Sequence, residues 1–233
     1  MIKSLFSKLD NRVYMIHCEK RRDRRRLVDT WTEAEGVRVN LFPAIIMPDG
    51  RQGCAASHKA LAQLLKTQNA NGYHLILEDD AVPRPTAYEN LAEVYEAMDS
   101  NEFDILWLGN LPMPSSQNTR WHSIRRGSAW TTHAILVNQR ALDFLATFEW
   151  KGTPIDVELA QAPLRGAWVH PEVFAQARGP SNVRSTSFTR MDAFGELMQL
   201  YTPLWRKVVY HKTTLCLFAA ALLLAFLIQH VQS

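Results

Sequence analysis

The chain has 233 residues, of which 47% are hydrophobic and 21% are charged, and its formal net charge is +3. This composition excludes a disordered protein and is sufficient for one buried core with a short appendage. The small net charge, and basic residues without interleaved aromatic residues, argue against a nucleic-acid binder. The three cysteines, Cys18, Cys54 and Cys216, are too few and too scattered for a disulfide framework or a zinc site. We therefore expect a reducing compartment.

The pattern of apolar residues predicts alternating strands and helices along the chain. Strands are expected at residues 12–17, 37–42, 73–77, 103–109, 132–137 and 168–176, the last with a kink at Pro171. Helices are expected after Asp23, at residues 53–65, 88–98 and 139–148, and from Pro154 onward. Residues 110–128 have no periodicity and are expected to form a long loop. This alternation favours an α/β fold with a largely parallel sheet and helices on both faces.

The apolar run at residues 73–77 ends in three adjacent carboxylates, Glu78, Asp79 and Asp80. A buried strand of this kind brings its last residues to the sheet edge, where open α/β folds bind ligands. Clustered carboxylates disfavour one another's charge unless a cation offsets them, and their oxygens suit Mg²⁺ or Mn²⁺ carrying a substrate phosphate. The segment therefore predicts a metal-nucleotide site. The alternative is a solvated acidic turn closed by the prolines that follow.

A cluster of basic residues follows the first predicted strand. Its members are Lys20, Arg21, Arg22, Arg24, Arg25 and Arg26. A helix capped by Asp23 would hold Arg21 and Arg22 near the carboxyl edge of the sheet, where they could contact phosphate. The alternative is a solvated cationic face of a helix.

Further polar residues lie at expected helix starts. Small residues such as Gly53 permit the first turn of the helix at 53–65 to approach a neighbour closely, and Ser57 and His58 in that region could touch a nucleotide. A lone histidine at a helix start is more often structural. Asp156 lies in the first turn of the helix that begins near Pro154, where its carboxylate could cap the helix or act as a base.

The C-terminal segment is uncharged and apolar over residues 213–228, and its extension to residue 231 is just long enough to cross a bilayer. Basic residues precede it, which places the folded part on the cytoplasmic side of the membrane. The alternative is a buried or interfacial helix. The start of the chain carries no secretory signal. We therefore expect a globular domain at 1–190, an amphipathic linker at 191–212 and a single-pass membrane anchor at 213–231.

In their order, these motifs resemble glycosyltransferase family 25, the lipopolysaccharide and collagen galactosyltransferase-like family. The matching series comprises residues 13–16 and 21–24, Gly53 and Cys54 with Ser57 and His58, residues 76–80, 134–137 and 154–156, and Pro171 with Gln176 and Ser181. Each motif is weak alone, but the series is specific and covers about residues 12 to 183.

The resemblance implies a GT-A fold, a UDP-sugar donor with galactose as the expected sugar, a bound Mn²⁺ or Mg²⁺, and inversion at the anomeric carbon. The acceptor would be a hydroxyl of a glycan, a lipid-linked glycan or a glycoprotein. Carried over by position, Glu78 and Asp80 would face the nucleotide and metal, with Asp79 between them partly turned into the protein. Asp156 would be the acceptor-side base. Candidate donor contacts are Arg21, Arg22, Ser57 and His58, and the metal shell would be completed by His170 or Gln176.

Two departures from the family pattern bear on donor binding. The first strand ends in His17, Cys18 and Glu19 where the family usually has Asn-Leu-Asp, and the residues before Gly53 lack the acidic side chain that is common there. A second hypothesis is therefore a catalytically degenerate transferase fold that serves as a membrane- or particle-associated binding protein. A third, an acidic-lipid or nucleic-acid binder using residues 20–26, is disfavoured by the small net charge.

Overall fold

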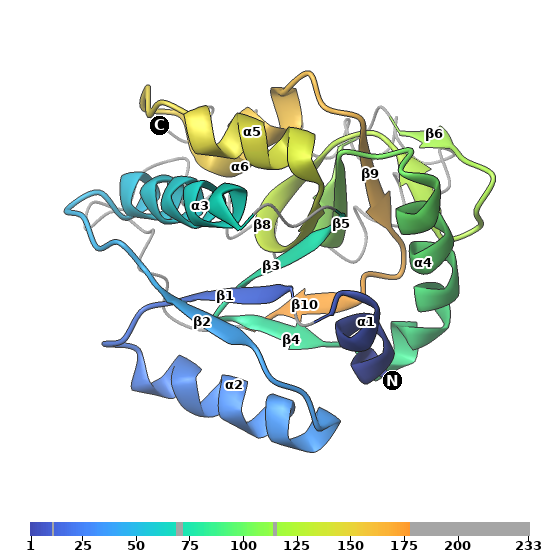
Figure 1. Ribbon diagram of the computed structural model, residues 1–233, viewed down its shortest axis with the longest axis horizontal. Coiled ribbons are helices and arrows are strands. Elements are labelled where there is room, and N and C mark those ends of the chain that lie inside the picture. The colour runs from blue at the N-terminus through green and yellow to red at the C-terminus, as the bar shows by residue number, and fades with distance from the viewer. Residues whose placement is uncertain (11, 69–71, 114–115, 178–233) are drawn as a thin grey trace, which may run out of the picture.

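The computed structural model describes residues 1–10, 12–68, 72–113 and 116–177. An eight-stranded sheet lies at the centre of this part of the chain, with helices on both faces (Figure 1). In spatial order its strands are β2 (Asn40–Pro43), β1 (Val13–His17), β3 (His74–Glu78), β8 (Ala129–Val137), β5 (Ile105–Pro112), β9 (Gly166–Val169), β7 (Ile124–Arg126) and β6 (Gln117–Asn118).

The sheet is mixed. Strand β1 pairs in parallel with β2 and β3, and β5 pairs in parallel with β9. Strand β8 lies between β3 and β5 and runs antiparallel to both, and β7 runs antiparallel to β9. The prediction of an α/β fold with a mixed, mostly parallel sheet agrees with this arrangement, and such a sheet fits the GT-A-like class that the motifs imply.

The helices form two layers. One face of the sheet is covered by α3 (Gly50–Thr67), α5 (Gln139–Thr147) and α6 (Ile155–Gln161), and the other by α1 (Ile2–Lys8), α2 (Arg22–Glu35) and α4 (Leu91–Ser100), which follows the 3-10 helix η1 (Pro85–Asn90). A two-stranded sheet of β4 (Ala81–Pro83) and β10 (Phe174–Gln176) lies on the α1 and α2 side, where Trp31 of α2 packs edge-on against Phe174. Each layer of helices therefore has its own core.

Alternating side chains of the central strands divide between these two cores. On β3, Leu75 and Leu77 face the core under α2 and α4, while Ile76 faces the core under α3 and α5. All three side chains are fully buried. Each such side chain contributes about 1.5 to 3 kcal/mol when it leaves water, and the two-residue period fixes which face it enters. This double burial is why residues 75–77 of the strand, between His74 and Glu78, are all apolar.

Three local predictions differ from the structure. Residues 110–128 are not a plain loop, because β5 continues to Pro112 and the segment contains β6 and β7. The expected kinked strand at 168–176 is two strands, since β9 ends at Val169 and β10 belongs to the smaller sheet. The N-terminal helix α1 was not expected, and it is held by burial of Ile2, Leu5 and Phe6.

The predicted fold class is wrong in one part, the transmembrane helix. A membrane-spanning helix needs about 20 consecutive apolar residues. The longest described helix, α3, has 18 residues and carries Arg51, Lys59 and Lys66, and no helix of the described ranges is both long and apolar enough to cross a bilayer. The predicted linker at 191–212 and anchor at 213–231 lie outside the described residues. The described part of the chain therefore does not support the predicted single-pass anchor or the membrane localisation deduced from it.

Candidate functional site

Three strands bring polar residues to one edge of the sheet. Because β1 and β3 are parallel, with Ile16 opposite Glu78, the residues after both strands emerge at the same edge. Strand β8 is antiparallel to β3 and pairs Ala134 with Leu77, so its early residue Thr132 enters at that edge. The prediction that the acidic residues follow a buried strand at the sheet edge is confirmed.

Asp79 is turned into the protein and is fully occupied by neighbours. Its side chain is buried. The Oδ2 atom accepts a hydrogen bond from the backbone N–H of Cys18 at 3.0 Å and also lies 2.9 Å from Nδ1 of His17, with which it pairs. Its Oδ1 lies 2.5 Å from Nη1 of Arg24, a residue in the first turns of α2. Asp79 therefore ties β1 and α2 to the end of β3.

Asp80 shares the same arginine. Its Oδ2 lies 3.0 Å from Nη2 of Arg24 and accepts a hydrogen bond from Nε2 of Gln176 at 3.3 Å. Its Oδ1 is buried and makes no hydrogen bond within the described part of the chain. A buried carboxylate oxygen without a partner is costly, so this atom is the one oxygen of the motif that is best placed to accept a ligand.

Glu78 faces the opposite side of this edge, toward α3. Its Oε1 accepts a hydrogen bond from Oγ1 of Thr132 at 2.6 Å and lies 3.8 Å from Nε2 of His58. Burial, followed by the nearby charge of Asp80, raises the pKa of Glu78. The hydrogen bond from Thr132 opposes that shift without cancelling it. Glu78 therefore favours the protonated form more than an exposed glutamate does.

Asp156 lies close to this acidic group, in the first turn of α6. Its Oδ1 accepts a hydrogen bond from the backbone N–H of Val157 at 2.9 Å, within the first turn of the helix, but the carboxylate does not cap α6, whose N-cap residue is Pro154. Burial raises the pKa of Asp156, and its charge is close enough to raise the pKa of Glu78 as well. A carboxyl group whose pKa is moved upward in this way is better suited to accept a proton near neutral pH.

A second group forms where α3 passes Glu78. Cys54 and His58 are four residues apart on α3, and their ligand atoms and a carboxylate oxygen of Glu78 all lie within 4.8 Å of one another. His58 is fully buried, which lowers its pKa. Burial, followed by the charge of Glu78, raises the pKa of the Cys54 thiol well above its usual value. In the described ranges this is the one such group of three His, Cys, Asp or Glu residues.

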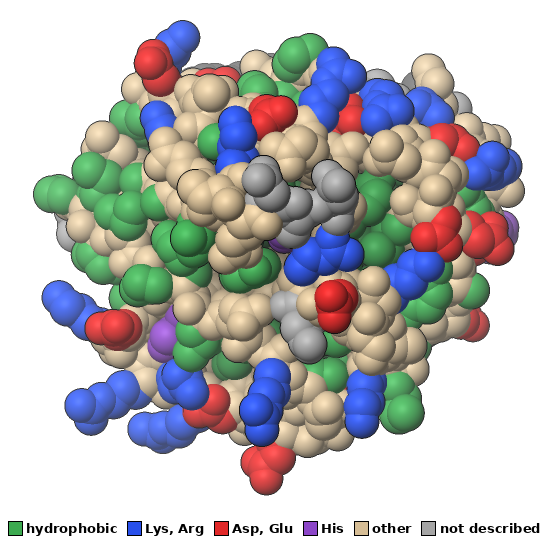
Figure 2. All heavy atoms as spheres, in the orientation of Figure 1, with side chains coloured by type: hydrophobic (Ala, Val, Ile, Leu, Met, Phe, Trp, Pro, Cys, Tyr) green, Lys and Arg blue, Asp and Glu red, His purple; other side chains and the backbone are tan. Residues whose placement is uncertain are grey.

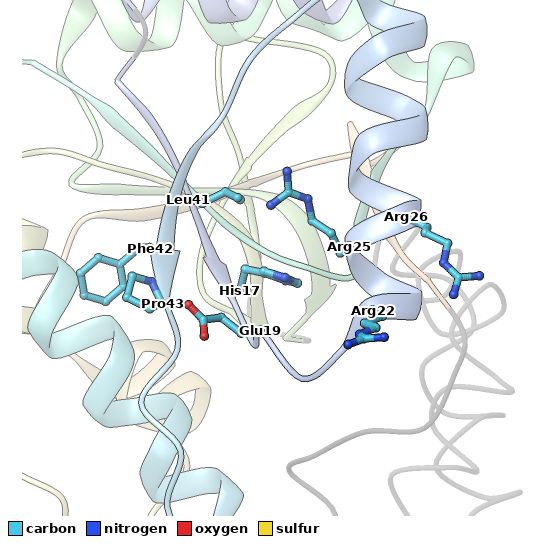
Figure 3. A pocket seen from close by; sticks show the side chains of 8 residues that line it. All are labelled: His17, Glu19, Arg22, Arg25, Arg26, Leu41, Phe42 and Pro43. Carbon is cyan, nitrogen blue, oxygen red and sulfur yellow. The ribbon is translucent and has the colours of Figure 1, made fainter.

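A basic cleft of about 450 Å³ lies beside Asp79, at the carboxyl ends of β1 and β2. It is lined by His17, Glu19, Arg22, Arg25, Arg26, Leu41, Phe42 and Pro43. Figure 3 shows Arg25 reaching from α2 toward β2, with Arg22 at the start of the helix. Figure 2 shows Lys and Arg side chains gathered over α2, with acidic residues among them. Because His17 both lines the cleft and contacts Asp79, the cleft adjoins the acidic motif.

The arginines of the basic run have different roles. Arg21 forms an ion pair with Asp23 at 2.6 Å, and Arg25 pairs with Asp29 four residues later at 2.8 Å. Arg22 lines the cleft, and its contact with a phosphate stays a prediction. Arg24, which the sequence analysis did not single out, holds both aspartates of the motif.

Two other predicted site residues lie away from the cleft. Ser57 is buried, donates to the carbonyl oxygen of Gly53 at 2.7 Å and accepts the N–H of Ile45 at 2.8 Å, so its hydroxyl is used within the fold. His170 follows β9, where its N–H donates to the carbonyl oxygen of Ser123 and its ring packs edge-on to Trp168. The structure therefore does not bring His170 into a ligand group with Glu78 and Asp80.

The predicted Mn²⁺ or Mg²⁺ set of Asp80, Glu78 and His170 does not fit a preformed three-ligand site. His170 lies elsewhere, and one oxygen of Asp80 is committed to Arg24. The free Oδ1 of Asp80 remains suitable as a single carboxylate ligand.

Comparisons with known proteins give distant similarity to several solved structures. No protein-family model and no curated protein matches the sequence. Among solved structures, the chain is similar to A197 from STIV, with a TM-score of 0.42 and 10% identity over 75% of this chain and 98% of that one. It is also similar to a glycosyltransferase involved in the glycosylation of the major capsid of PBCV-1, with a TM-score of 0.42 and 10% identity over 70% of this chain and 92% of that one.

A third similar structure is the inositol-1-phosphate CTP transferase from T. maritima, with a TM-score of 0.39 and 14% identity over 80% of this chain and 75% of that one. Membership of glycosyltransferase family 25, expected from the motifs, therefore stays a prediction.

Proposed function

We propose that the protein is a glycosyltransferase that uses a nucleotide-sugar donor. The observation that carries the proposal is the direct contact between the basic cleft and the acidic sheet edge, through His17 and Asp79. A nucleotide diphosphate needs cationic side chains, whereas the sugar and the acceptor hydroxyl need carboxylates that orient them and accept a proton. The resemblance to family 25 supports UDP as the nucleotide and galactose as the sugar.

The donor would occupy the cleft. Arg22 and Arg26 line it, and neither forms an ion pair with another of the described residues. Their guanidinium groups would bind the two phosphates and stabilise the charge that develops on the leaving diphosphate. Phe42 and Leu41 provide an apolar wall that suits the face of a base.

The acceptor hydroxyl would be activated by Asp156. In an inverting displacement the acceptor oxygen bonds to the anomeric carbon as the bond from that carbon to the diphosphate breaks, and the bonding electrons leave with the diphosphate. The proton of the hydroxyl passes to the carboxylate of Asp156, whose pKa is raised by burial. Asp80 would orient the sugar through its free oxygen, Oδ1.

A second candidate is a donor-binding protein without turnover. It is favoured by Arg24, because this side chain neutralises both aspartates of the motif from within the chain. Such a protein would bind a UDP-sugar without releasing UDP. Binding and product release must therefore be measured separately.

The test compares donor binding with turnover in matched variants. A thermal-shift screen of UDP-sugars, with and without Mn²⁺, identifies the donor and the ion, and UDP release in the presence of glycan acceptors measures turnover. Asp156→Asn should lower turnover by about 10²- to 10⁴-fold while donor binding persists. The control is Asp143→Asn, which alters an exposed aspartate paired with Lys66. Equal turnover in both variants would exclude Asp156 as the base, and an absence of any nucleotide-sugar binding would exclude the proposed function.

A further inference from the structure

We propose that Cys54, His58 and Glu78 form a binding site for a divalent transition-metal ion of the zinc type. The inference does not depend on the proposed transferase activity, because it concerns ion binding alone. It also revises the interpretation of the cysteines, which by number and spacing in the sequence do not suggest a metal site.

The three residues converge because of how α3 crosses the end of β3. Residues four apart on a helix share one face, so Cys54 and His58 both project toward the same neighbour. That neighbour is Glu78, the last residue of β3. Two rigid elements therefore supply a sulfur, a nitrogen and an oxygen within 4.8 Å of one another.

The hydrogen bonding of His58 fixes which of its nitrogens is available. Nδ1 lies 3.1 Å from the carbonyl oxygen of Cys54, and a carbonyl can only accept, so Nδ1 must carry the hydrogen. The lone pair of the neutral ring is then on Nε2. This atom is buried, has no partner in hydrogen-bond geometry within the described part of the chain although the backbone of Thr132 lies near the ring, and faces Oε1 of Glu78 at 3.8 Å. Metal-binding histidines commonly have this arrangement, with the second nitrogen donating to a backbone carbonyl.

The ligand atoms favour a zinc-type ion over Mg²⁺ or Mn²⁺. A thiolate and an imidazole are preferred by Zn²⁺ and its neighbours in the transition series, whereas the harder ions prefer oxygen alone. Tetrahedral coordination at the usual Zn²⁺ bond lengths separates the ligand atoms by roughly 3.4 to 3.6 Å. Cys54 and Glu78 are both partly exposed, so modest side-chain rotation can close the remaining distance.

The surroundings complete the site. The hydroxyl of Thr132 donates to Oε1 of Glu78 and orients that carboxylate. Three protein ligands leave a fourth position for water or a ligand oxygen. Since Glu78 also belongs to the acidic edge, an ion at this site would compete with any ion that uses Glu78 together with Asp80.

Cobalt binding tests the proposal directly. The full chain is treated with a chelator under reducing conditions and titrated with Co²⁺, without nucleotide. We expect one Co²⁺ per chain, a thiolate-to-cobalt charge-transfer band, and displacement of the ion by Zn²⁺. Cys54→Ala should abolish the band, and His58→Gln should weaken Zn²⁺ affinity at least about tenfold. If Cys54→Ala does not fold, Cys54→Ser has nearly the same volume and is expected to give the same loss.

The other two thiols provide the matched control. A Cys18→Ala/Cys216→Ala variant keeps Cys54 as its one cysteine and should retain the band. Absence of the band in the parent chain, or its persistence in Cys54→Ala, would overturn the proposal. Because the spectrum is recorded without a sugar donor, failure here would leave the transferase proposal standing, and failure of donor binding would leave the metal site standing.

Discussion

Replacing Arg24 by glutamine tests the ion-pair network that holds the acidic motif in place. Arg24 contacts Asp79 and Asp80 at 2.5 and 3.0 Å, and the three side chains are only 15%, 4% and 7% exposed. Glutamine retains most of the side-chain length but carries no charge. The variant therefore leaves two buried carboxylates without their shared cation.

The expected loss follows from these contacts. A hydrogen bond between charged groups contributes about 1.5 to 3 kcal/mol, so two of them set an upper range of about 3 to 6 kcal/mol. Asp79 keeps its contacts with His17 and Cys18, which lowers that range. Removing one partner of a buried ion pair generally costs about 3 to 5 kcal/mol, and we expect the same here. For a chain of this size the loss corresponds to roughly 6 to 20 °C in the unfolding temperature.

Urea denaturation of Arg24→Gln and Arg25→Gln provides the assay. Arg25 lies next in sequence, and its pair with Asp29 is exposed, so its replacement should cost only about 0.5 kcal/mol. A double-mutant cycle of Arg24→Gln with Asp79→Asn isolates the pairwise energy, expected to exceed about 1 kcal/mol. Equal midpoints and slopes for the two arginine variants would refute the view that Arg24 is the internal counter-ion of the motif.

Two further predictions concern stability. Burial alone would raise the pKa of Asp104, but the hydrogen bonds from the side chain and N–H of Arg165, and from Asn138, outweigh burial and lower it. The stability that the ionised carboxylate contributes is therefore present above pH ~4 and is lost as the pH falls further. The difference in unfolding free energy between the parent and Asp104→Asn should accordingly shrink below that pH. A difference that stays constant with pH would contradict this role of Asp104. Gly109→Ala should destabilise the fold by about 2 kcal/mol or more, because the added Cβ would lie 2.0 Å from Nε2 of the buried His133. Urea denaturation measures this loss, and an unchanged midpoint would contradict the close packing of Gly109 against His133.

The position of the acidic motif could be predicted from the sequence because local rules determine it. Residues 75–77 alternate between two cores, so the strand had to be apolar throughout and the charges had to follow it. Asp79 was expected to turn partly into the protein, and it does so. Strand pairs formed by distant segments, such as β4 and β10, gave no comparable local signal.

The choice among the arginines was within reach of the sequence. Arg24, Val28 and Trp31 are spaced by four and three residues, so they share the buried face of α2, whereas Arg22, Arg25 and Arg26 lie on its exposed side. Helix phase therefore points to Arg24 as the inward-facing cation. The contact of Cys54 and His58 with Glu78 could be predicted only in part. The spacing of four residues places Cys54 and His58 on the same face of a helix, but it does not identify the strand that this face contacts.

Gly53 lies where α3 packs closely against the segment that follows β2, and the missing side chain permits this close packing. A Cβ there would lie 2.7 Å from the carbonyl oxygen of Ile45, in the segment that continues from the cleft wall of β2. One turn further along the same helix, Ser57 holds the N–H of Ile45, and His58 faces Glu78. A single added methyl group would thus push the helix and that segment apart, and the displacement would reach the arginine-lined hollow and the sulfur-containing triad together.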